Sequence, residues 1–336
     1  METQESISSA DTRKSLIKVT KLTKRFDQVT AVNEISFDVH RGELFGFLGP
    51  NGAGKTTTIN MLTGLAKPDS GTIQIAGLEY AKNPKAAQHL IGVVPDESNL
   101  YPELSGFDNL CFCASLYGIH KSERRTRAKE LLETFGLKEA AYRKFAGYSK
   151  GMKRKLTIAA GIIHHPHILF LDEPTTGIDV ASARQIRQLI ADLHRSGTTI
   201  FFTTHYIEEA ERLCERIAFI VKARIVAIDT VLNLLQPIQE RSSMLISLSN
   251  PADDLCGKLA TAFPHYEFQS LYPDQVRVES AARISVGALV RFIENQGAEV
   301  TEARLLRPSL EEVFIRVTGI ELDIMRKEKE RTGGSL

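Results

Sequence analysis

Residues 49–56 read Gly-Pro-Asn-Gly-Ala-Gly-Lys-Thr, which fits the spacing G-x-x-x-x-G-K-[ST] at every fixed position. Glycines let the backbone approach a phosphate closely, and the first N–H groups of a following helix favour an anion. Lys55 would neutralise the β- and γ-phosphates and act in catalysis, and the Thr56 hydroxyl would hold Mg²⁺. The segment therefore predicts a loop that binds a nucleoside triphosphate. Its expected contacts are Gly49, Pro50, Asn51, Gly52, Ala53, Gly54, Lys55, Thr56 and Thr57.

Two carboxylates follow an apolar run at residues 168–171, where the sequence continues as Asp172-Glu173. The carboxyl ends of parallel strands form the edge at which α/β folds bind ligands. We expect Asp172 to hold Mg²⁺, directly or through water. Glu173 faces differently and can act as the general base that polarises an attacking water.

Elements that could position these residues follow from the hydrophobic pattern. Continuous apolar runs of strand length predict strands buried on both faces, at residues 43–49, 168–172, 199–204 and 216–221. Helical patterns lie between them, for example at 54–65 and 182–197. The alternation predicts an α/β core. Residues 102–165 are mostly helical in pattern and predict a helical insertion between two strands; Lys153-Arg154-Lys155 within it predicts a solvated helix face.

A second domain is predicted after residue 230, with the order βαββαβ of ferredoxin-like folds. The expected strands are 243–248, 265–270, 275–279 and 299–305, and the expected helices are 252–262 and 283–296. A closing helix at 308–319 has Ser309 as its N-cap and Glu312 as its capping-box partner. The predicted organisation is a mobile tail at 1–15, an α/β domain that carries the phosphate loop at 16–228, a small α+β domain at 229–320 and a charged tail at 321–336.

The composition restricts the class of protein. The 336 residues include 43% hydrophobic and 25% charged side chains, which excludes a largely disordered or fibrous chain. Lys plus Arg is 42 and Asp plus Glu is 41, so the net charge of +1 gives no reason to expect nucleic-acid binding. The sequence contains no apolar run of membrane-spanning length and no secretory signal, so we expect an intracellular globular protein.

The segment Tyr148-Ser149-Lys150-Gly151-Met152 lies just upstream of the acidic strand, and here the sequence resembles the ATP-binding subunits of ABC transporters. That family has an LSGGQ signature at this place, which caps a helix and binds the γ-phosphate of ATP held by the opposite subunit. Ser149 and Gly151 match the signature, whereas Tyr148, Lys150 and Met152 depart from it. Lys150 either contacts phosphate or is simply solvated.

Further positions match the family one by one. His205 follows the apolar run 199–204 and stands where the family has a switch histidine that contacts the γ-phosphate. Residues 177–179 stand at the D-loop, which contacts the partner subunit. Phe26 stands where an aromatic ring stacks on adenine. Asp96 replaces a glutamine that senses Mg²⁺ and the membrane subunit, and its carboxylate suits Mg²⁺ as well.

The resemblance covers residues 16–228, and the region 230–319 resembles the C-terminal extension of ATPases from multidrug- and polysaccharide-exporting systems. It implies a P-loop ATPase with ATP and Mg²⁺ that powers export. It also implies a separate membrane-spanning subunit and a second ATPase subunit, identical or homologous, at the cytoplasmic face of the membrane. The cargo is not encoded in this chain, because cargo contacts lie in the membrane subunit.

Three alternatives belong to other classes. A soluble ATP-gated clamp on nucleic acid or on another molecular machine would favour a basic surface or long coiled coils, and the sequence shows neither. A regulatory ATPase with negligible hydrolysis would fit a chain without Glu173, which is present. A P-loop kinase would not explain Ser149, Asp179 and His205 together.

Overall fold

The computed structural model describes residues 14–239, 242–250, 254–306 and 308–319. The chain forms two compact units, one reaching to Asp229 and the other spanning Thr230–Gly319. The predicted tails fall almost entirely outside the described residues, although Ser15 already belongs to the first strand. In the described part of the chain, no helix is both long and apolar enough to cross a membrane.

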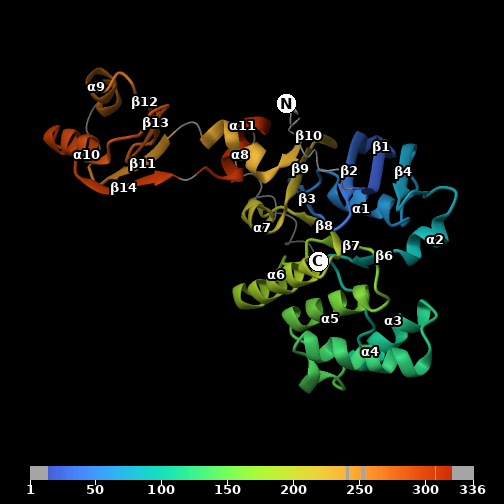
Figure 1. The fold of residues 1–336 in the computed structure, drawn as a ribbon. Coiled ribbons are helices and arrows are strands. Elements are labelled where there is room, and N and C mark those ends of the chain that lie inside the picture. Colours follow the sequence, from blue (N-terminus) through green and yellow to red (C-terminus); the bar gives the residue numbers. More distant parts are fainter. Residues whose placement is uncertain (1–13, 240–241, 251–253, 307, 320–336) are drawn as a thin grey trace, which may run out of the picture. The chain divides into compact units, whose positions relative to one another are not determined.

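The first unit contains a six-stranded sheet with the order β10-β9-β3-β8-β7-β6 (Figure 1). Its strands are β3 (Leu44–Leu48), β6 (Ile91–Val94), β7 (Ile168–Asp172), β8 (Thr199–Thr204), β9 (Arg216–Val221) and β10 (Arg224–Thr230). The strand β3 pairs in parallel with β8 and β9, and β7 pairs in parallel with β8 and β6. Every residue of β3, β7 and β8 is buried, as the continuous apolar runs predict. Because these three strands are neighbours, their carboxyl ends meet at one edge.

Helices follow strands of this sheet: α1 (Lys55–Leu62) comes after β3, α6 (Val180–Arg195) after β7 and α7 (Ile207–Leu213) after β8. The helix α2 (Pro84–His89) precedes β6. The helix predicted at 54–65 is therefore shorter than expected and ends with Thr63 as its C-cap. The helix α6 begins after Asp179, whose carboxylate accepts a hydrogen bond from the Ser182 N–H.

A second sheet of the first unit is antiparallel along β2-β1-β4-β5, and the sequence analysis did not predict it. Its strands are β1 (Ser15–Phe26), β2 (Val29–His40), β4 (Ser70–Ile75) and β5 (Leu78–Glu79). Register shifts interrupt the pairing of β1 with β2 and hide the alternation that would identify these strands. The sheet packs on the core through Phe37, whose ring stacks on Phe45 at 5.7 Å.

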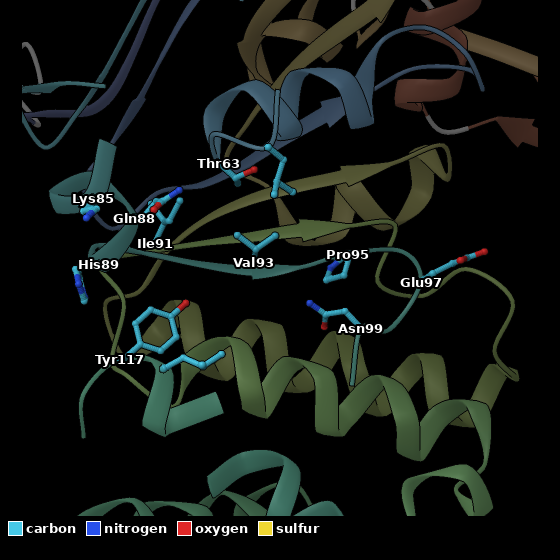
Figure 2. A pocket seen from close by; sticks show the side chains of 12 residues that line it. Thr63, Lys85, Gln88, His89, Ile91, Val93, Pro95, Glu97, Asn99 and Tyr117 are labelled. Carbon is cyan, nitrogen blue, oxygen red and sulfur yellow. The ribbon is translucent and has the colours of Figure 1, made fainter. Parts of the chain in front are cut away.

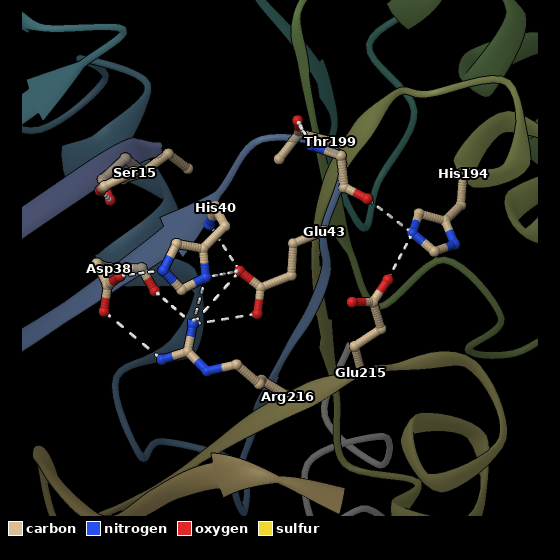
Figure 3. A network of polar contacts seen from close by, with 10 residues as sticks. Ser15, Asp38, His40, Glu43, His194, Thr199, Glu215 and Arg216 are labelled. Carbon is tan, nitrogen blue, oxygen red and sulfur yellow. Dashed lines mark hydrogen bonds and ion pairs between the residues drawn. The ribbon is translucent and has the colours of Figure 1, made fainter. Parts of the chain in front are cut away.

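A buried ion-pair network also joins the two sheets (Figure 3). The Glu43 carboxylate is 1% exposed and lies 3.1 Å from the Arg216 guanidinium at the start of β9. At the end of β2, His40 Nδ1 lies 3.3 Å from the Glu43 carboxylate, and the Asp38 carboxylate lies 3.5 Å from the Arg216 guanidinium. A buried carboxylate needs such partners, so the network fixes the end of β2 against β9.

The helical insertion lies between β6 and β7, as predicted. It consists of α3 (Gly106–Leu116), α4 (Lys121–Thr134) and α5 (Lys150–Ile162), with two short 3₁₀ turns at Lys138–Ala140 and Phe145–Gly147 (Figure 1). The Ser105 hydroxyl caps α3 by accepting from the Asp108 N–H. The buried Tyr148 hydroxyl donates to the Ala140 carbonyl at 2.7 Å and so fixes the approach to α5.

The second unit has the predicted βαββαβ order and an antiparallel sheet in the order β12-β13-β11-β14. Its elements are β11 (Ser242–Leu248), α9 (Leu255–Ala262), β12 (Glu267–Tyr272), β13 (Gln275–Ser280), α10 (Val286–Asn295) and β14 (Val300–Leu306). The unpredicted α8 (Val231–Gln239) precedes them, and α11 (Leu310–Thr318) closes the unit. Ser309 caps α11 as expected, whereas the Glu312 carboxylate pairs with Arg277 of β13.

Candidate active site

The loop between β3 and α1 has the geometry of a phosphate cradle. A Cβ added to Gly49 would lie 2.1 Å from the Ile220 carbonyl oxygen, so close packing against β9 requires glycine there. Gly54 has a φ of 109°, and a Cβ added to it would lie 2.4 Å from the Ala31 carbonyl oxygen. Gly54 is also the N-cap of α1 and offers no side chain to the first N–H groups of that helix. Those groups therefore remain available to an anion.

A pocket of about 330 Å³ opens over this loop. The predicted site residues that line it are Asn51, Gly52, Gly54, Lys55, Thr56, Thr57, Asp96, Glu173 and His205. Four other lining residues, Val29, Thr30, Ala31 and Thr176, were not predicted from the sequence. No motif marks the first three, because they enter the pocket through β2 of the antiparallel sheet. Thr176 could have been suspected from its place just after the carboxylate pair.

Glu173 is the centre of a buried polar cluster in this pocket. One carboxylate oxygen lies 3.2 Å from Lys55 Nζ, and the other lies 2.7 Å from His205 Nδ1. The Thr176 hydroxyl also donates to the carboxylate, at 3.0 Å. Burial raises the pKa of Glu173, but the His205 hydrogen bond and the Lys55 charge outweigh it and lower the pKa to about 2. The carboxylate is therefore ionised at neutral pH, as a general base must be.

Lys55 makes two further contacts that keep it on the loop. Its ammonium donates to the carbonyl oxygens of Gly49 and Pro50, at 2.9 and 3.2 Å. The side chain is only 6% exposed. Lys55, the cation predicted to bind phosphate, thus lines the pocket beside Glu173, the predicted general base.

Asp172 is the last residue of β7, is 4% exposed and is not among the residues that line the pocket. Its carboxylate accepts a hydrogen bond from the Thr203 hydroxyl of β8 at 2.6 Å. Thr203 also accepts from the Glu173 N–H, so one β8 threonine fixes both carboxylate residues, a role that the sequence analysis missed. Glu173 itself, directly after β7, adopts a φ of 48°, which is unusual for a residue other than glycine.

The donor set fits a hard cation. The Asp172 carboxylate and the Thr56 hydroxyl are oxygen ligands of the kind that Mg²⁺ prefers. Over the described residues, no group of three or more His, Cys, Asp or Glu side chains is arranged to hold a metal. A Mg²⁺ ion held by Asp172 and Thr56 would take its other ligands from water and from the phosphates, as is usual for this ion.

Known proteins resemble this chain over most of its length. Residues 32–176 match the family model described as ABC transporter. The linearmycin resistance ATP-binding protein LnrL of Bacillus subtilis (strain 168) is 34% identical over 307 residues, covering 90% of this chain and 98% of the relative. The chain belongs to the ABC transporter ATP-binding proteins. The resemblance stated from the motifs is therefore confirmed.

Other similar proteins belong to the same family. The doxorubicin resistance ATP-binding protein DrrA of Mycobacterium tuberculosis (strain CDC 1551 / Oshkosh) is 36% identical over 295 residues, or 87% of this chain and 89% of the relative. A dimeric structure of the cassette MJ0796 in a post-hydrolysis state bound to ADP and Pi has a TM-score of 0.59 and 26% identity, covering 64% of this chain and 98% of that chain. The protein is thus the ATP-binding and ATP-hydrolysing subunit of an ABC exporter, and the clamp alternative is not favoured.

The signature segment of this ABC subunit lies on the helical insertion and does not line the pocket over the phosphate loop. The Ser149 hydroxyl caps α5 by accepting from the Met152 N–H at 3.2 Å. Gly151 is buried, and a Cβ added to it would lie 2.4 Å from the Ser182 hydroxyl oxygen. Packing of α5 against α6 therefore requires this glycine, whatever it contacts in a nucleotide-bound dimer. Lys150 is exposed.

The prediction for Arg154 is wrong. Its sequence context predicts a solvated helix face, but Arg154 is 8% exposed. Its guanidinium donates to the carbonyl oxygens of Pro95 and Asp96, both at 2.6 Å, and lies 3.3 Å from the Asp96 carboxylate. Burial raises the pKa of Asp96, and the Arg154 charge opposes that effect. Asp96 lines the pocket, and it is also bound to α5 through Arg154. Its role toward Mg²⁺ stays a prediction.

Phe26 lies at the end of β1 and is 50% exposed. Lys24 lies over its ring, 5.1 Å from the centroid, and is held there by an ion pair with Asp69 at 3.0 Å. Phe26 is not among the residues that line the pocket, whereas Val29, three residues later, is. Its stacking on adenine stays a prediction from the resemblance.

Proposed function

We propose that ATP and Mg²⁺ bind over the phosphate loop and that Glu173 acts as the general base of hydrolysis. The observation that carries the proposal is the position of Glu173, whose carboxylate lies within reach of both Lys55 and His205 in the pocket. When bound, Mg²⁺ would neutralise charge on the β- and γ-phosphates. Thr56 and Asp172 would hold it, with Asp96 as the third candidate ligand.

The residues of this chain would divide the chemistry between them. Lys55 would leave Glu173 and contact the phosphates, where its charge stabilises the γ-phosphoryl group. The ionised Glu173 carboxylate would then orient water and accept its proton. His205 would remain hydrogen-bonded to Glu173 and so keep the base in position. Its other possible role is the contact with the γ-phosphate that the family resemblance implies.

Members of this family pair with a membrane-spanning subunit and form cassette dimers. We propose that this chain lies at the cytoplasmic face of the membrane and dimerises with an identical or homologous ATPase subunit. Ser149 of one subunit would then face ATP bound to the other. The exposed helix N-terminus at Ser149 supports this arrangement, because its N–H groups favour a phosphate.

A groove of about 580 Å³ offers a site for the membrane subunit (Figure 2). It is lined by Thr63, Leu65, Lys85, Gln88, His89, Ile91, Val93, Pro95, Glu97, Asn99, Leu116 and Tyr117. Leu65 and Leu116 are 74% and 68% exposed, which suits an apolar helix as the occupant. Pro95 and Glu97 flank Asp96, so an occupant here would contact the segment that also lines the nucleotide pocket.

The first experiment is affinity purification of the chain from detergent-solubilised native membranes, with identification of the proteins that co-purify. The expected result is a multispanning membrane protein at near-equal stoichiometry, lost in a Leu65→Asp/Leu116→Asp variant. Tyr142→Asp is the matched control, because Tyr142 is 72% exposed on the helical insertion and outside the groove. Recovery of soluble partners alone would contradict the transport coupling, and equal recovery with all variants would contradict the groove.

A further inference from the structure

Glu209 is a buried carboxylate for which the proposed mechanism has no role. It lies on α7 and is 9% exposed. Both of its oxygens are engaged: the Thr175 hydroxyl donates to one at 2.5 Å, and the Arg187 guanidinium donates to the other at 2.6 Å. Burying a charge requires such partners, so this carboxylate is held in one orientation and in turn fixes the side chains that it binds.

Glu209 and its two partners come from three different segments of the chain. Thr175 lies two residues after Glu173 and is 5% exposed. Arg187 lies on α6, which begins after the D-loop residue Asp179. Glu209 therefore links the segment 173–179, which carries the base, to both the following helix and α7.

The same link reaches the switch histidine. The helix α7 begins at Ile207, two residues after His205, whose ring bonds to the Glu173 carboxylate. A closed path therefore starts with the hydrogen bond from Glu173 to His205 and follows the chain into α7 as far as Glu209. It returns through the hydrogen bond of Glu209 to Thr175, which lies two residues after Glu173. A closed path of this kind leaves the base few alternative orientations, which matters because Glu173 adopts a φ of 48° that is rare for its residue type.

We infer that Glu209 is a positioning residue for ATP hydrolysis, which holds Thr175 and α7 so that Glu173 and His205 keep their mutual orientation. The inference rests on the proposed role of Glu173 as base. Glu209 does not line the nucleotide pocket, so its loss should leave ATP binding unchanged. A misplacement of the base by about 1 Å is enough to lower turnover by about 100-fold.

The test compares steady-state ATP hydrolysis and nucleotide affinity in the full chain. Glu209→Gln and Thr175→Val should lower kcat by about 10- to 100-fold, with KM and the Kd for ATP within about twofold of the wild type. Thr175→Ser, which keeps the hydroxyl, should restore most of the turnover. Glu208→Gln is the matched control, because Glu208 precedes Glu209 on α7 and is 69% exposed.

A second comparison separates positioning from general destabilisation. In a Glu173→Gln background, Glu209→Gln should cause no further loss of turnover, because its effect acts through the base. Wild-type kcat in Glu209→Gln, or a further loss in the Glu173→Gln background, would overturn the inference. A Glu209→Gln protein that does not fold leaves the Thr175→Val and Thr175→Ser pair to decide. Wild-type turnover in Glu173→Gln alone would instead overturn the proposed base.

Discussion

The Glu173 carboxylate lies 3.2 Å from the Lys55 ammonium, and both side chains are buried. Each is the other's counter-ion in the pocket that the phosphate loop forms. Lys55 cannot fully pair with Glu173 and bind a nucleotide phosphate at the same time. In the proposed mechanism, nucleotide binding would exchange the carboxylate for phosphate as the partner of Lys55, and it would free Glu173 to orient water.

Replacing Glu173 with Gln should lower ATP turnover by about 10²- to 10⁴-fold, because the amide cannot accept a proton from water. Affinity for ATP should be unchanged or slightly higher, since the neutral side chain competes less with phosphate for Lys55. Phosphate release and nucleotide titration measure the two effects. Glu130→Gln, at an exposed position of α4, is the control. Turnover like that of the wild type would exclude Glu173 as the base.

Lys55→Ala should weaken ATP binding by about 10- to 100-fold, which corresponds to loss of a charge-assisted hydrogen bond. The variant also leaves the Glu173 carboxylate without its nearest cation, so turnover should fall as well. Equilibrium binding of a fluorescent ATP analogue checks the affinity. The exposed Lys67→Ala serves as control, and an unchanged affinity in Lys55→Ala would refute the assignment.

Acid should destabilise the wild type more than Glu173→Gln. The pKa of Glu173 is lowered from 4.5 to about 2 in the folded protein. The unfolded state therefore binds more protons between these values. The stability that the carboxylate contributes is present above pH 4.5 and is lost as the pH falls toward 2. Thermal unfolding midpoints measured from pH 5 to pH 3 should converge for the two proteins; parallel curves would contradict the pKa.

His164 should make stability depend on pH in a higher range. Its ring stacks on Tyr117 with the centroids 3.6 Å apart, and its Nε2 lies 2.9 Å from the Ile91 carbonyl oxygen. Its Nδ1 is buried and has no hydrogen-bond partner among the described residues, so a second proton would be unsatisfied. Burial lowers the pKa of His164 to about 4, although the bond to Ile91 opposes that effect.

Because this pKa lies below the unfolded value, the unfolded state takes up the proton first as the pH falls. Stability is therefore lost between about pH 6.5 and pH 4. We expect the Tm of the wild type to fall between pH 7.5 and 5.0 by about 2 to 6 °C more than the Tm of His164→Phe, which keeps a ring on Tyr117. Calorimetry at both pH values tests this, and the other histidines are common to both proteins. An equal fall would show that His164 does not titrate in this way.

The sequence by itself determined the parts of this protein that depend on local residue order. The phosphate loop, the acidic strand end at Asp172 and Glu173, and the helical insertion all follow from short-range spacing and hydrophobic period. The βαββαβ order of the second unit follows from the same signals, and its sheet order agrees with that fold. Such features are predictable because neighbouring residues alone decide them.

Tertiary structure decided what distant segments contribute. The antiparallel sheet that brings Val29, Thr30 and Ala31 to the pocket depends on pairing across bulges, which no periodicity shows. Thr203 and Glu209 reach the carboxylate segment from β8 and α7, about 30 residues away in the chain. Arg154 carries a sequence signal typical of a solvated face, yet it is buried on the carbonyl groups of residues 95–96. A side chain's partners depend on which surfaces fold against it, so long-range contacts alone decided these roles.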